Sequence, residues 1–125
     1  MRGGPFIRNS GDVTWAEIGV IKSWNGFTTT IPSPAGFERL TGVSEPGRFI
    51  GTLVSAGGEK RGWTSFKGGT SFLDPPAAQP GDYFEPKSVN SCGSIVGVVH
   101  RANGTTSGLL FAKSFRCDIS PIVTQ

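Results

Sequence analysis

The fold class is decided by residues 94–113, where two apolar runs flank a turn: Ser94-Ile95-Val96-Gly97-Val98-Val99, then Asn103-Gly104, then Leu109-Leu110-Phe111-Ala112-Lys113. Asparagine and glycine both tolerate positive φ, which a type I′ turn requires at its two central residues. The stretch therefore predicts a β-hairpin with Asn103-Gly104 at its tip. We predict the same two-residue turn at Asn25-Gly26 and at Gly57-Gly58.

Short strand-like segments recur through the rest of the chain. Runs rich in β-branched and aromatic residues at 13–22, 27–31, 37–43, 48–56, 59–66 and 70–73 are separated by glycine and proline. We therefore predict an all-β fold of about 8–10 short strands, arranged as an antiparallel sandwich, a jelly roll or a small barrel. We expect a single β domain over residues 1–125. The expected core consists of Trp15, Ile18, Val20, Phe27, Phe49, Leu53, Ile95, Val98, Leu109, Phe111 and Phe115.

Charge and hydropathy narrow the functional classes. The chain has 125 residues, of which twelve are basic and nine acidic, and its net charge is +3. No block of like charge marks a tail for nucleic acid, and no apolar run approaches the roughly 18 residues that a membrane span needs. We expect no membrane span, and we expect the proline-rich segment 74–82 to be a surface loop.

The clearest resemblance in the chain begins at Ser91-Cys92-Gly93-Ser94 and continues through His100 to Asn103-Gly104. It is similar to the end of viral chymotrypsin-like cysteine proteases, and this implies that Cys92 is a nucleophile and that His100 lines a substrate pocket. Only seven residues separate Cys92 from His100, and the chain has no second histidine to act as the base. A fragment of such a protease is therefore a remote alternative, and we predict no enzymatic activity.

Metal and cofactor sites are not indicated by the sequence. The cysteines, the histidine and the carboxylates lack zinc or calcium spacing, and no glycine-rich segment matches a phosphate-binding fingerprint. We predict that the protein binds no metal and no cofactor.

Basic and aromatic residues interleave at 60–67, the composition that a β surface uses to hold phosphates and stack on rings. The candidate ligand-binding residues are Lys60, Arg61, Trp63 and Lys67, together with Tyr83. Strand alternation places Trp63 and Phe66 on opposite faces, so the alternative is that one of them packs in the core while the cations are solvated.

The two cysteines and one asparagine are candidates for covalent modification. The predicted turn register sets Cys92 opposite Phe115 and diagonal to Cys117, about 7 Å away. A bulge of one or two residues would bring Cys92 and Cys117 within disulfide range; otherwise both are small buried hydrophobes. Asn103-Gly104-Thr105 matches the N-glycosylation acceptor pattern at Asn103, although turn chemistry also explains these residues.

A β domain without catalytic residues is typical of proteins that act as a surface. Our first hypothesis is a non-enzymatic virion structural or surface protein, meaning a capsid, decoration or host-binding domain. Its partners would be further copies of itself, other virion proteins, or a host glycan or receptor, and its location virion or extracellular. The alternative is a carbohydrate- or nucleic-acid-binding module acting through exposed aromatics such as Trp24, Trp63 or Tyr83. A glycan site requires an exposed aromatic platform beside polar side chains, whereas a capsid role predicts buried aromatics.

Overall fold

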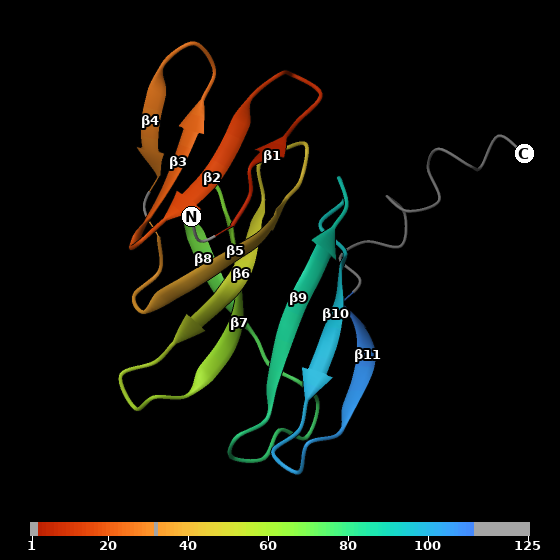
Figure 1. Ribbon diagram of the computed structural model, residues 1–125. Helices are drawn as coiled ribbons and strands as arrows, with labels where there is room; N and C mark the ends of the chain where they lie inside the picture. Colours follow the sequence, from red (N-terminus) through yellow and green to blue (C-terminus); the bar gives the residue numbers. More distant parts are fainter. Residues whose placement is uncertain (1–2, 32, 112–125) are drawn as a thin grey trace, which may run out of the picture.

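The computed structural model describes residues 3–31 and 33–111, which form eleven antiparallel strands and no helix (Figure 1). The predicted all-β class is confirmed. The strands form three sheets, of order β1-β2-β3-β4, β5-β6-β7-β8 and β11-β10-β9, and within each sheet every strand pairs only with strands next to it in the chain. Their bounds are β1 Phe6–Ile7, β2 Val13–Glu17, β3 Val20–Trp24, β4 Thr28–Ile31, β5 Phe37–Val43, β6 Phe49–Val54, β7 Lys60–Phe66, β8 Gly69–Leu73, β9 Tyr83–Val89, β10 Ile95–His100 and β11 Thr106–Phe111.

The three sheets are layered, and the β5–β8 sheet is the middle layer. Side chains alternate across its strands, so that Leu53 of β6 faces the β1–β4 sheet while Ile50 of the same strand faces the β9–β11 sheet. The first core contains Ala16, Ile21, Leu40, Leu53 and Trp63. The second core contains Ile50, Leu73, Phe84, Ile95 and Val99.

The predicted core is right where a strand side chain faces another sheet, and wrong in the turns and on strand faces that point away from both cores. Leu53 and Ile95 are buried, and Phe49, Leu109 and Phe111 pack against the cores. Ile18 and Phe27 are 80% and 81% exposed, because each lies in a turn rather than in a strand. Trp15, Val20 and Val98 are half-buried strand residues that belong to neither core, so the prediction is wrong for them. Phe115 lies outside the described residues.

The predicted type I′ turns are wrong at all three positions. Asn25, Gly57 and Asn103 do not have positive φ; only the glycine after each of them does. At Gly57-Gly58 and at Asn103-Gly104 the hairpin loop has three residues, and the same is true of three other hairpins. With the residue that flanks the loop on each side, each turn is a unit of five residues. The glycine N–H donates to the C=O of the first residue of the unit, and the N–H of that first residue donates to the C=O of the fifth. These five-residue units are 8–12, 44–48, 55–59, 90–94 and 101–105.

This pattern is a type I turn followed by a glycine bulge, the usual geometry of a three-residue hairpin loop. Each unit ends its turn on a glycine with φ between +86° and +98°, namely Gly11, Gly47, Gly58, Gly93 and Gly104. The hairpin between β7 and β8 is different, because only two residues, Lys67 and Gly68, lie between the paired residues Phe66 and Gly69. Both of these loop residues have positive φ. The extra loop residue shifts the register of β10 and β11 by one residue from the predicted register.

Trp63 belongs to the first core and packs against a glycine on the neighbouring strand. Its side chain is completely buried, and its register partner on β6 is Gly51. A Cβ atom at Gly51 would lie 2.9 Å from Cζ2 of the indole and 2.0 Å from the carbonyl oxygen of Arg39. Any side chain at position 51 would therefore displace the ring or the β5 backbone.

The turn geometry predicts opposite effects for two adjacent glycines. Gly58→Ala should lower the free energy of unfolding by about 1–2 kcal/mol, because alanine is strained at the positive φ of Gly58. Gly57→Ala should change it by less than about 0.5 kcal/mol or raise it, because the φ of Gly57 lies outside the left-handed region. Urea denaturation of both variants measures the difference. An equal loss for both would instead indicate a type I′ turn.

Candidate functional site

The outer face of the β1–β4 sheet carries two tryptophans and is covered by no other sheet of the described residues. Strand alternation turns Thr14 and Ala16 inward, and both are buried. Val13, Trp15 and Glu17, which alternate with them on β2, therefore point outward, together with their cross-strand partners on β3. We call this surface the tryptophan face; its residues are Ile7, Val13, Trp15, Glu17, Val20, Lys22, Trp24, Thr28 and Thr30.

Register places the two indoles close together. Trp24 pairs with Val13, and Trp15 lies two residues further along the same strand and on the same side. Trp15 and Trp24 are thus diagonal neighbours, about 7 Å apart at their backbones. Trp24 is 47% exposed, so its ring is open to a ligand.

Charged and hydroxyl groups lie between and beside the indoles. The Trp15 Nε1–H donates to Glu17 Oε2 at 2.9 Å, and Lys22 Nζ lies 3.4 Å from Glu17 Oε1. The hydrogen bond from Trp15 lowers the pKa of Glu17, and the positive charge of Lys22 lowers it further by a smaller amount. The carboxylate is therefore held ionised and fixes the edge of the Trp15 ring, while Lys22 pairs across the sheet with Thr30.

The residues predicted to bind a ligand divide among four places. Lys60 and Tyr83 do come together, with Lys60 Nζ 5.4 Å from the centre of the Tyr83 ring. Arg61 lies over Phe72 at 3.8 Å and is paired with Asp74, and Lys67 lies in the β7–β8 turn. Trp63 is a correction: its side chain faces the first core and has no exposed surface, so it cannot contact a ligand.

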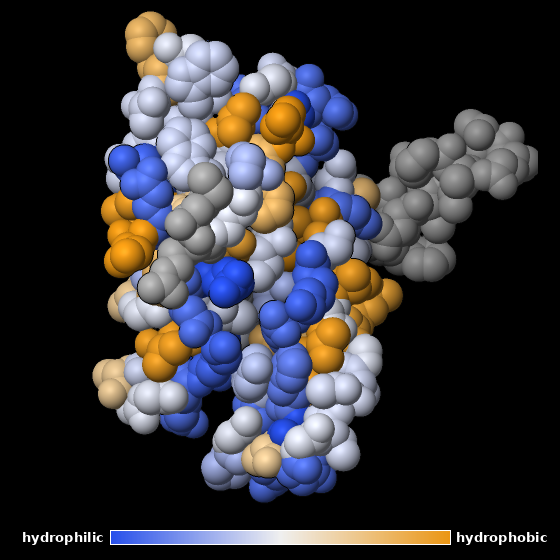
Figure 2. Space-filling model, in the orientation of Figure 1, coloured by the Kyte–Doolittle hydropathy of each residue, from blue (hydrophilic) through white to orange (hydrophobic). Residues whose placement is uncertain are grey.

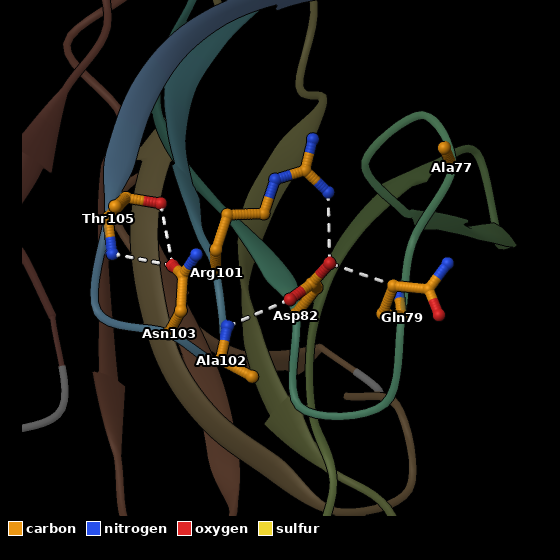
Figure 3. Close-up of a pocket in the computed structure, with 7 residues that line it drawn as sticks. All are labelled: Ala77, Gln79, Asp82, Arg101, Ala102, Asn103 and Thr105. Atoms are coloured by element: carbon orange, nitrogen blue, oxygen red, sulfur yellow. Dashed lines mark hydrogen bonds and ion pairs between the residues drawn. The ribbon is translucent and has the colours of Figure 1, made fainter.

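A hollow of about 500 Å³ lies beside the loop 74–82, but the polar group at its centre is already bonded (Figure 3). The carboxylate of Asp82 accepts hydrogen bonds from the N–H of Gln79 at 2.9 Å, from the N–H of Ala102 at 2.8 Å and from Arg101 Nη1 at 2.9 Å. Its side chain is only 4% exposed. Asp82 therefore attaches the loop to the β10–β11 hairpin, and we assign it a structural role.

The candidates for covalent modification lie in two of the glycine turns. Asn103 is exposed, and its Oδ1 accepts hydrogen bonds from the N–H and the hydroxyl of Thr105. Glycosylation there stays a prediction. Cys92 is disulfide-bonded, and its predicted partner Cys117 lies outside the described residues.

The two residues implied by the protease resemblance are engaged elsewhere. A disulfide-bonded sulfur cannot act as the nucleophile, and Cys92 has such a bond. His100 Nε2 lies 2.8 Å from Glu85 Oε1, and the His100 ring stacks on Tyr83 with 4.7 Å between ring centres. Residues 3–31 and 33–111 contain no cluster of side chains that could hold a metal ion and no helix of the length and hydropathy needed to cross a membrane.

Comparison with known proteins gives no relative for this chain. No protein-family model, curated protein sequence or solved structure matches it.

The contacts of Asp82 predict an acid-sensitive loop attachment. The backbone N–H groups of Gln79 and Ala102, with Arg101, lower the pKa of Asp82 from its usual value of 3.8. The stabilisation is thus fully present above about pH 4 and is lost as the pH falls through the lower folded-state pKa. Asp82→Asn should lower the melting temperature at pH 7, and the difference from wild type should shrink toward pH 2. Asp74→Asn, at an exposed ion pair, is the control and should have little effect at either pH.

Proposed function

We propose that the protein is a non-enzymatic carbohydrate-binding domain that presents the tryptophan face to a glycan on a host or extracellular surface. The observation that carries this proposal is the diagonal pair Trp15 and Trp24, on the outer face of a sheet and beside Glu17 and Lys22. The C–H face of a sugar ring packs on an indole, while its hydroxyl groups need donors and acceptors at the ring edge.

The polar groups of the tryptophan face favour a sugar over a protein partner. The core of a protein–protein interface is depleted of charge. Here the ion pair of Lys22 and Glu17 lies on the same two strands and the same face as the indoles. The hydroxyls of Thr28 and Thr30 lie beside this face on β4. Apolar and polar groups alternate over short distances, as they do on a saccharide.

The proposal predicts a selective loss of affinity. Trp24→Ala should weaken binding to a retained polysaccharide about tenfold, because it removes one stacking surface. Affinity electrophoresis in gels containing a neutral β-glucan, a mannan or a xylan, and fluorescence titration with a sialylated N-glycan, measure this.

The matched control is Phe27→Ala. Phe27 is an aromatic residue that is 81% exposed, but it lies in the β3–β4 loop outside the tryptophan face. Its loss should change affinity by less than about twofold. Equal losses for both variants, or no retention by any of these glycans, would contradict the proposal.

A second candidate, a homo-oligomeric virion structural protein, is favoured by the β4 edge. The β4 strand, Thr28–Ile31, lies at the edge of its sheet and is uncharged, rich in β-branched residues and largely exposed. An edge of this kind is suited to pair with a strand of another copy.

Assembly through β4 predicts a concentration-dependent molar mass in light scattering. Thr29→Lys should reduce that mass to the monomer value, because a lysine on an edge strand opposes edge pairing. A wild-type chain that is monomeric at every concentration would contradict this second candidate.

A further inference from the structure

A polar groove of about 620 Å³ lies apart from the outer face of the β1–β4 sheet, where β5, β7 and β9 meet. Figure 2 shows hydrophilic side chains gathered along the seam between the β5–β8 sheet and β9. Three cations, Arg39, Lys60 and Lys87, line this groove with one carboxylate, Glu85. We call it the basic groove.

Bulges in two of these strands determine which side chains enter the groove. The pairing of β9 with β10 passes from Ser88 directly to Pro86, so Lys87 is the extra residue of a bulge. Proline lacks the N–H that a regular ladder needs, and bulges are where sheets accommodate it. Strand β5 is bulged twice, at Glu38 and at Thr41, on either side of Arg39. Bulges re-aim side chains and are over-represented beside functional sites.

The cations are incompletely neutralised. Glu85 pairs with Lys87 at 3.1 Å and also accepts a hydrogen bond from His100, while Lys60 is 3.4 Å from Glu38. Arg39 is exposed, and no carboxylate of the described residues lies within ion-pair distance of it. An unpaired guanidinium that lines the same groove as two lysines is suited to bidentate contact with an oxyanion.

We propose that the basic groove is a second binding site, specific for the sulfate or carboxylate groups of an acidic polysaccharide. The aromatic residues favour this ligand over a single-stranded nucleic acid, which needs open rings on which bases stack. Tyr83 already has the His100 ring stacked on it and Lys60 over it. Phe6, the aromatic that lines the groove, packs against the first core.

Calorimetric titration tests the site directly, with a heparin oligosaccharide as the sulfated probe and oligogalacturonate as the carboxylated probe. Arg39→Gln should weaken binding of the preferred probe about tenfold, because it removes a charge-assisted contact. Lys87→Gln, on β9, serves as a second variant in the same groove. The melting temperature of each variant shows whether it is folded.

The control is Lys67→Gln, which makes the same change of charge at the other end of β7. It should change affinity by less than about twofold, since only long-range electrostatics are altered. Equal weakening by Lys67→Gln, binding of neither probe, or tighter binding of an oligothymidylate would overturn the proposal.

The basic groove does not depend on the tryptophan face. Trp24→Ala should leave the affinity for heparin or oligogalacturonate unchanged, and Arg39→Gln should leave neutral-glycan binding unchanged. A failure of one site is therefore distinguishable from a failure of the other.

Discussion

A glycine with positive φ at the fourth residue of each five-residue turn sets the register on which the other contacts depend. A slip of one residue turns every side chain of a strand to the opposite face. In the observed register Ile95 and Phe111 pair and face the second core together, while Val96 and Leu110 pair on the exposed side. The turns thus determine which residues are available for packing and which are available for binding.

The sequence predicted the strands and hairpins because turn residues and β-branched runs are local signals. It could not predict the loop length, since Asn-Gly and Gly-Gly fit both a two-residue and a three-residue loop. Phe27 shows the consequence. A two-residue loop at Asn25-Gly26 would place Phe27 in a strand, but the observed loop is one residue longer, so Phe27 lies in the loop and is exposed. The alternative that Trp63 or Phe66 packs in the core is confirmed for Trp63. Which of the two is buried could not be predicted, because alternation places them on opposite faces but does not show which sheet has both faces covered.

The two binding surfaces differ in how far they could be predicted. Trp15, Lys22 and Trp24 are close in the chain, so their common side follows from alternation once β2 and β3 are aligned. The basic groove brings together residues from β5, β7 and β9, and two of its walls depend on bulges that break alternation. Pro86 was the available signal, because a proline within a strand indicates a bulge or an edge.

The consecutive strand order has a consequence for how the chain folds. Every sheet is made of strands that are adjacent in the chain, so the entropy lost in closing each hairpin loop is small. Contacts of high sequence separation arise chiefly where one sheet docks on another, which lowers the contact order of an all-β topology. Each sheet is therefore a natural cooperative unit of partial opening. Both outer sheets are held on one face only, but β9 lies against β5, β6 and β7, whereas the main contact of the β1–β4 sheet with the middle layer is between β2 and β5. The β1–β4 sheet is therefore the unit whose release disturbs the rest of the described structure least.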